Sequence, residues 1–140
     1  MYANGQGVPQ DDAEAVRWLR LAAGQGNANA QDNLGNMYDY GRGVPEDAAE
    51  AVRWSRLAAD QGHASAQGNL GYMYANGRGV PQDYVQAHMW FNLAASRMTG
   101  VVRELAVERR DLAADELTPD ALNEAERLAR EWDAAHPREP

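Results

Sequence analysis

Residues 30–45 read AQDNLGNMYDYGRGVP and residues 66–81 read AQGNLGYMYANGRGVP, so two nearly identical stretches lie 36 residues apart. The first 36 residues share 25 positions with the next 36, and those share 13 with the following 36. A period of this length indicates a helical repeat protein, in which each unit packs against its neighbours. The third copy diverges after Ala95, as a terminal repeat does when its outer face meets water.

Each unit is predicted to form two helices, because apolar residues recur with helical spacing. The first helix covers about residues 28–40, its counterpart in the next unit covers about 64–76, and the second helix covers about 46–61. The apolar face of the second helix consists of Ala51, Trp54, Leu57 and Ala58. No stretch alternates between apolar and polar residues with period two, so no strand is predicted.

The start and stop signals of these helices recur in register. An Asp followed three residues later by Glu or Gln is a capping box, and it occurs at Asp11, Asp47 and Asp83. The Gln-Gly pairs at residues 25–26 and 61–62 are typical helix stops, and a Gly-x-Gly turn precedes each Val-Pro. The 26 alanines allow helices to approach closely, while large apolar side chains fill the remaining space.

The C-terminal part follows a different pattern. A helix is predicted from about Val101, with an apolar stripe at Val102, Leu105, Leu112 and Ala113. Thr118 and Pro119 are typical of an N-cap and a first helical position. The closing helix that they start carries a stripe at Leu122, Ala125, Leu128, Ala129 and Trp132. We therefore expect a repeat array at 1–117, a C-terminal capping helix at 118–136 and a frayed tail at 137–140.

The composition excludes several classes of protein. The chain has 140 residues, no Cys and a net charge of −8. These values exclude disulfides, Cys-ligated metals and thiol catalysis, and they argue against binding to nucleic acid. No run of about 18 apolar residues exists, so no membrane insertion is predicted. No signal peptide opens the chain, so the sequence as given indicates a cytoplasmic protein; an upstream signal would make it periplasmic or secreted.

Two repeated patterns carry a resemblance to a known family. AQxNLGxMYxxGRGVP occurs at 30–45 and 66–81, and AVRWxRLAAxQG occurs at 15–26 and 51–62. Together they resemble the two helices of the Sel-1-like repeat, over about the first 100 residues, and the chain end is similar to the closing helix of bacterial members. The resemblance implies an all-α, right-handed solenoid of antiparallel helix pairs, related to tetratricopeptide arrays. It also implies an adaptor role, because such proteins mostly bind other proteins.

No residue pattern indicates catalysis, a metal or a cofactor. The aromatic residues that recur every 36 positions are interpreted as core: Trp18, Trp54, Trp90, Tyr2, Tyr38 and Tyr74. The Gly-x-Gly-Val-Pro loops lack the preceding strand and the Lys of a phosphate loop. His63 falls at a helix start, and neither His88 nor His136 has a partner at ligand spacing. We therefore expect a non-enzymatic protein with no cofactor and no metal site.

The remaining candidate is a polar stripe on the first helix of each unit. Its members fall at i, i+4, i+7 and i+11: Asn29, Asn33, Asn36 and Tyr40, then Ser65, Asn69, Tyr72 and Asn76. In the solenoid that the resemblance implies, first helices line the concave side. Asn can bond a peptide backbone through its paired donor and acceptor, and Tyr adds rigid contact area. The candidate binding residues are Asn29, Asn33, Asn36, Tyr40, Asn69, Tyr72 and Asn76.

Alternatives remain open for this stripe and its surroundings. Asn33 and Asn69 belong to the repeat's own Asn-Leu-Gly signature, so they can also bond between helices. Arg42 and Arg78 either form a basic rim or are solvated loop charges. We predict a scaffold that binds a partner peptide or helix on the concave face; the alternative is an envelope-glycan-binding or hydrolase-type accessory domain using the same groove. Because the chain opens inside a repeat, self-association through the open N-terminal half-helix is a further expectation.

Overall fold

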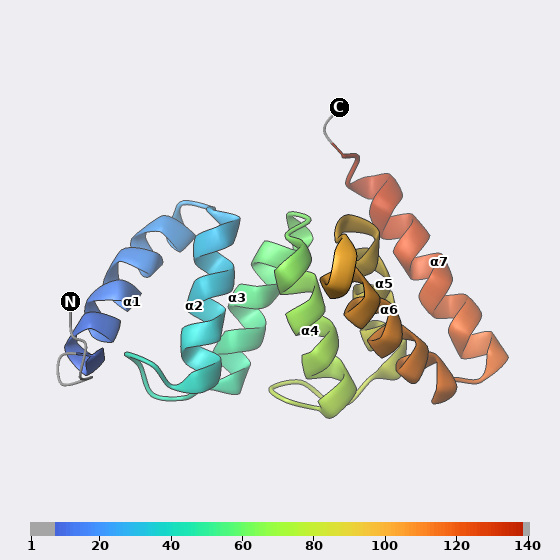
Figure 1. The fold of residues 1–140 in the computed structure, drawn as a ribbon, viewed down its shortest axis with the longest axis horizontal. Helices are drawn as coiled ribbons and strands as arrows, with labels where there is room; N and C mark the ends of the chain where they lie inside the picture. Colours follow the sequence, from blue (N-terminus) through green and yellow to red (C-terminus); the bar gives the residue numbers. More distant parts are fainter. Residues whose placement is uncertain (1–7, 139–140) are drawn as a thin grey trace.

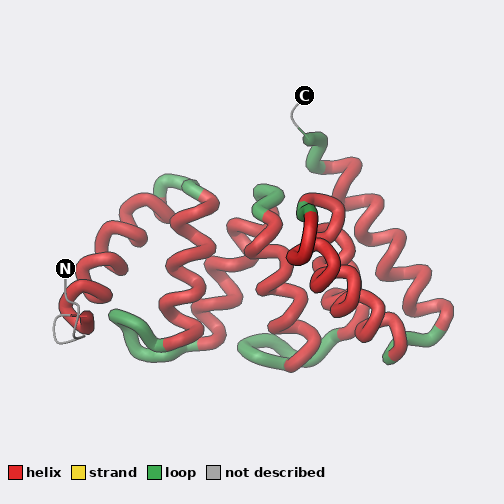
Figure 2. The backbone as a smooth tube through the Cα atoms, in the orientation of Figure 1, coloured by secondary structure: helices red, strands yellow, loops and turns green. Residues whose placement is uncertain are grey.

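The computed structural model describes residues 8–138, and this range contains seven α-helices and no strand (Figures 1 and 2). The helices are α1 (Val8–Gly24), α2 (Ala28–Tyr40), α3 (Ala48–Asp60), α4 (Ala64–Asn76), α5 (Tyr84–Arg97), α6 (Gly100–Asp115) and α7 (Pro119–Ala135). Four expectations lie outside the described residues: the core position of Tyr2, the first Gly-x-Gly turn, the open N-terminal half-helix before that turn and the last two residues of the frayed tail.

The helices form an all-α solenoid of antiparallel pairs, as the repeat predicts. They follow one another along the long axis of the molecule, with α1 at one end and α7 at the other (Figure 1). From α1 to α6 each helix packs against the next, whereas α7 packs mainly on α5. Each interface therefore joins elements that are close in sequence, which is typical of a repeat array.

Side-chain caps start most of the helices. In five of them the cap accepts a hydrogen bond from the backbone N–H three residues later, at 2.9–3.2 Å: Asn27, Asp47, His63, Asp83 and Thr118. The predicted caps at Asp47, Asp83 and Thr118 are thereby confirmed, as is the helix-start position of His63. The predicted cap at Asp11 is wrong, because α1 already begins at Val8. Asp11 lies in the first turn instead, where its negative charge complements the helix dipole.

In the two Gly-x-Gly turns that the structure describes, the second glycine brings two repeats into close contact. Gly79 has φ +77°, and a Cβ there would lie 2.4 Å from the carbonyl oxygen of Ala48 at the start of α3. Gly43 has the same relation to Asp12 in α1. Any larger residue would collide with the backbone of the preceding repeat. This steric limit explains why a glycine recurs at this point every 36 residues.

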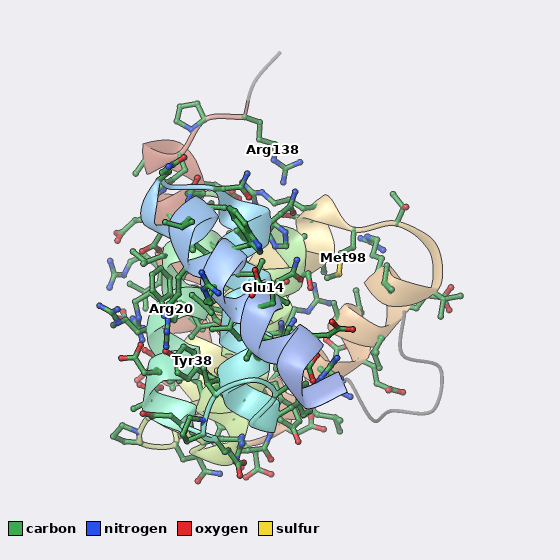
Figure 3. The ribbon with its side chains drawn as sticks, turned by 90° about the vertical axis from the view of Figure 1, so that its left-hand side faces the viewer. Glu14, Arg20, Tyr38, Met98 and Arg138 are labelled. Atoms are coloured by element: carbon green, nitrogen blue, oxygen red, sulfur yellow. The ribbon has the colours of Figure 1, made fainter. Side chains whose placement is uncertain are left out.

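An Arg–Tyr contact recurs between successive repeats. Arg20 of α1 donates a hydrogen bond of 2.6 Å to the hydroxyl of Tyr38 of α2, and its guanidinium lies 5.9 Å from the ring centroid (Figure 3). Arg56 and Tyr74, which lie 36 residues later, make the same hydrogen bond and the same stacking contact at 5.5 Å. These contacts hold both tyrosines at the border of the core, where Tyr38 is half-buried and Tyr74 is buried.

The burial of the three equivalent tryptophans increases along the chain. Trp90 is 3 % exposed, Trp54 is half-buried, and Trp18 is 63 % exposed. The core prediction is therefore confirmed for Trp90, partly met by Trp54 and wrong for Trp18. Trp54 packs against side chains of α1 and α2, but no element within residues 8–138 packs on the corresponding face of α1. Leu57, also predicted as core, is 43 % exposed on α3.

The apolar stripe of α6 is mostly not in the core. Ala106 and Ala113 are buried, whereas Val102, Leu105 and Leu112 are exposed. The prediction of the helix itself is confirmed, but the large side chains of its stripe do not pack inside. The helix meets its neighbours through its small residues, so its large apolar residues face the surface next to α4.

Candidate binding groove

A groove of about 460 Å³ lies between α2, α4 and α6. Polar and aromatic side chains of α2 and α4 line one part of it: Asn36, Asp39, Tyr40, Ser65, Asn69 and Tyr72. Apolar side chains line the part formed by α6 and the residues before it: Met98, Val102, Leu105 and Ala106. The side chain of Phe91 from α5 also lines it. We call this feature the groove; it is built by three first helices from three successive units.

A second hollow of about 300 Å³ continues the groove along α6. It is lined by Ala75, Asn76, Tyr84, Leu112, Ala113 and Glu116. Tyr72, Phe91 and Arg109 line both cavities. Arg109 is exposed on α6, and its guanidinium lies 5.6 Å from the centroid of the Tyr72 ring on α4. This stacked pair therefore stands at the junction between the groove and the second hollow.

The structure brings most of the predicted stripe to this surface. Four of the seven candidate residues line the groove, namely Asn36, Tyr40, Asn69 and Tyr72, and Asn76 lines the second hollow. Asn29 and Asn33 line neither. Asn29 Oδ1 lies 2.7 Å from Nε2 of His63, which links α2 to the start of α4, and Asn33 is exposed.

Three of the amides in this surface, Asn69, Asn36 and Asn76, already take part in hydrogen bonds within the protein. Asn69 Nδ2 donates to Asp32 Oδ1 at 3.1 Å and to Asn36 Oδ1 at 3.4 Å, so it joins α4 to α2. Asn76 Nδ2 donates to the backbone oxygen of Tyr72 at 2.9 Å. The alternative role of Asn69, a bond between helices, is therefore observed. Because Asn36 Oδ1 accepts one of these bonds, Tyr40 and Tyr72 remain as the freer groups of the stripe.

The sequence-based prediction of the binding surface did not include the apolar residues of α6. Helical spacing predicts Val102, Leu105 and Leu112 as one stripe, but it does not say what the stripe faces. The missing information was which neighbour the stripe faces, because a stripe that packs inside and one that lines a groove have the same period. Arg109 lies between Leu105 and Leu112 along α6. A charged residue within an apolar stripe was the available sign that this stripe is not buried in the core.

Ion pairs between repeats fix the loops beside the groove. Arg78 donates to Asp39 Oδ1 at 2.6 Å, to the Asp39 carbonyl at 2.8 Å and to Glu46 at 2.7 Å. The hydrogen bonds to Glu46 and Asp39 raise the pKa of Arg78 above its usual value. Arg42 pairs with Asp12 at 3.2 Å. Both arginines therefore pair with acidic residues of the preceding helices, which argues against a free basic rim, and Arg42 remains exposed in its loop. The carboxylate of Asp39 in the groove is compensated by Arg78.

Other classes of site have little support among residues 8–138. No three His, Asp or Glu side chains in that range gather as metal ligands would. His88 is 4 % exposed in α5, away from the groove. Burial lowers its pKa, and the positive charge of Arg110 lowers it further. Among the seven described helices, none is both long and apolar enough to cross a membrane.

The stacked helix pairs and the contacts between repeats define a helical repeat protein. The model of the Sel1 repeat family matches residues 1–27, 28–63 and 64–97. The chain therefore belongs to the Sel1 repeat family, as its repeated patterns predict. Proteins of this family generally bind other proteins as scaffolds, and the fold is generally non-enzymatic.

Two solved structures are similar to this chain over most of its length. A protective antigen of uropathogenic Escherichia coli strains with an SLR fold matches with a TM-score of 0.82 and 39 % identity. The match covers 89 % of this chain and 26 % of that protein, so the chain spans about a quarter of its length. A Sel1 repeat protein from Oxalobacter formigenes matches with a TM-score of 0.66 and 43 % identity, covering 79 % of this chain and 80 % of that one. No curated protein sequence matches the chain.

Proposed function

We propose that this chain is a non-enzymatic scaffold that binds a peptide or helix of a partner protein in the groove between α2, α4 and α6. One observation carries the proposal: large apolar side chains from three helices converge on this surface and remain exposed. They are Tyr40 of α2, Tyr72 of α4, and Val102 and Leu105 of α6. Contiguous exposed apolar surface is characteristic of interaction sites, and binding other proteins is the general role of the family.

The chemistry of the groove favours binding over turnover. Among the described residues, the groove has one lining carboxylate, Asp39, and the second hollow has one, Glu116. Glycoside hydrolysis uses two carboxyl groups about 5 to 9.5 Å apart across the scissile bond. Asp39 is engaged by Arg78, so it is poorly placed to act as a general acid or base. These features support the scaffold over a hydrolase-type accessory domain.

A matched pair of substitutions tests the groove. Leu105→Asp places a charge in the groove, whereas Leu57→Asp places the same charge on α3 outside it, and the two side chains are similarly exposed at 45 % and 43 %. Burying a Leu on binding contributes about 1.5–3 kcal/mol, so Leu105→Asp should weaken partner binding by at least about tenfold. Leu57→Asp should leave it unchanged.

The measurement starts from partners captured by the full chain and identified by mass spectrometry. Each identified partner is then titrated against both variants by isothermal calorimetry, with circular dichroism to verify folding. Equal affinities for the two variants would place the contact elsewhere and reject the groove.

A second contact surface supports self-association. Trp18 and Leu21 are both exposed and lie three residues apart on α1, so they share one face of that helix. In the next unit, the Trp equivalent to Trp18 is partly covered by α1 and α2. The exposed face of α1 is therefore suited to pack against a helix of another molecule, such as a second copy of this chain.

A further inference from the structure

We propose that the groove selects partner segments in which two apolar side chains flank an acidic one, with Arg109 receiving the carboxylate. This inference rests on the proposed function and specifies the chemistry of the partner. It follows from the position of one cation at the junction of the groove and the second hollow, with an exposed Leu of α6 on each side of it.

Arg109 occupies the junction of the two hollows. Its guanidinium stacks over the Tyr72 ring at 5.6 Å, and both residues line the groove and the second hollow. Stacking on Tyr holds the guanidinium plane in place while its N–H groups stay available as donors. A segment lying along α6 would therefore pass directly over these donors.

Arg109 has no carboxylate partner among residues 8–138, in contrast to Arg78 and Arg110. Arg78 is bound by Asp39 and Glu46, and Arg110 pairs with Asp111 at 3.1 Å and donates to Asn92. What distinguishes Arg109 is its place: it lines both hollows, so a bound segment would cover its unpaired guanidinium.

A partner that covers the groove must also satisfy Arg109. Removing a guanidinium from water is costly unless an acceptor replaces the lost hydration. A carboxylate is the best match, because it accepts two parallel N–H donors from one guanidinium. A neutral or basic partner residue at this point would leave the charge buried without compensation.

The positions of the apolar residues set the spacing of the partner's side chains. Leu105 lines the groove and Leu112 lines the second hollow. These two residues are seven apart on α6, which corresponds to roughly 10 Å along the helix axis. A helical partner would fit with apolar residues about seven apart. An extended partner would fit with apolar residues about four apart, because successive side chains of a strand alternate sides and only residues i, i+2 and i+4 share a face. In both cases the acidic residue lies between them.

Peptide display tests the inference with the full chain as bait. A library of random 12-residue peptides is selected on the wild type, on Arg109→Glu and on Arg103→Glu. Arg103 is exposed on the same helix and lines neither hollow, so its variant is a charge-matched control. We expect Asp or Glu between two apolar residues for the wild type and for Arg103→Glu. For Arg109→Glu we expect Lys or Arg at the same position.

Synthetic peptides then measure the contribution of the acidic residue. The best peptide is made with Glu or Gln at that position and titrated by fluorescence anisotropy. The Glu→Gln change should weaken binding by about fivefold on the wild type, the upper range of an exposed ion pair. It should have no effect on Arg109→Gln, which removes the charge but keeps an unbranched polar side chain and serves if Arg109→Glu does not fold.

Failure of the inference and failure of the proposed function give different results. Peptides that bind the wild type, lose binding with Leu105→Asp and show no acidic preference would overturn the role of Arg109 and leave the groove as a binding site. If no selected peptide depends on Leu105, the groove itself fails as the binding site, and the inference fails with it.

Discussion

The asparagine of the Asn-Leu-Gly signature has different surroundings in the two repeats that contain it. Asn69 joins α4 to α2 through hydrogen bonds to Asp32 and Asn36, whereas Asn33 is exposed on α2. The residue is the same, but its role depends on whether another first helix lies beside it. Sequence reasoning identified both positions and both possible roles, and only the packing of neighbouring helices distinguishes them.

His88 provides a test at the residue scale through the pH dependence of stability. Burial, and then the positive charge of Arg110, lower its pKa, while Glu126 and Asp111 oppose the shift. The unfolded chain therefore binds a proton more readily than the native state, starting near the ordinary His pKa of about 6.5. The contribution of His88 to stability is complete above this pH and decreases as the pH falls below it.

We expect His88→Gln to flatten this decrease. Between about pH 7 and 5.5 the free energy of unfolding should fall more steeply for the wild type than for His88→Gln. His88 accounts for at most about 1.4 kcal/mol of that fall per pH unit. Urea denaturation at several pH values measures both slopes. Parallel slopes for wild type and variant would show that His88 is not the group responsible.

At the scale of the element, helical period predicted where helices lie better than which way they face. The predicted helix from about Val101 is present as α6, and Thr118 starts α7 as expected. Yet Leu105 and Leu112 of α6 face the groove and the second hollow and not the core. Start and stop signals are local, because capping uses residues within one turn. Orientation depends on the neighbouring helix, which the period does not specify.

The capping role of α7 is a prediction at this scale. Trp132 meets Trp90 edge-on at 6.0 Å, and Ala125 and Ala129 are buried, so deleting residues 118–140 would expose the side of α5 that α7 covers. Losing a packed Trp alone costs about 3–5 kcal/mol, so the Tm should fall by roughly 10 °C or more, with some self-association.

Differential scanning fluorimetry and size-exclusion chromatography measure the outcome of this deletion. Arg127→Ala is the control on the same helix; it removes only the surface pairs with Glu124 and Glu131 and should leave the Tm nearly unchanged. A truncated protein that stays monomeric with the Tm of the full chain would contradict the capping role.

At the scale of the whole molecule, the groove results from stacking and not from any single unit. Tyr40, Tyr72 and Leu105 come from three successive first helices, and each lies on the groove only because the repeats pack in register. The charge is uneven as well: residues 103–140 contain 11 acidic and 6 basic side chains, against 10 and 7 before them. Arg109 is thus a cation in the more acidic part of the chain.

Self-association through α1 is the prediction that belongs to this scale. The wild type should show a concentration-dependent sedimentation coefficient, because association would cover Trp18 and Leu21. The double variant Trp18→Ser with Leu21→Ser should remain monomeric, while Leu57→Ser, also an exposed apolar residue of a second helix, should behave as the wild type. Analytical ultracentrifugation over a hundredfold range of concentration measures this. Identical sedimentation of wild type and double variant would rule out the α1 contact.

The sequence by itself determined the repeat length, the helices and most of their caps, the family, and four of the residues that line the groove. These features follow from local signals, such as period, capping residues and turn glycines, which act within one or two turns of the chain. The tertiary structure alone decided that Trp18 and Leu57 are exposed, that α6 lines the groove and that Arg109 stacks on Tyr72. Those outcomes depend on which surfaces of separate helices meet, and the free energy of that packing is shared between residues far apart in the sequence.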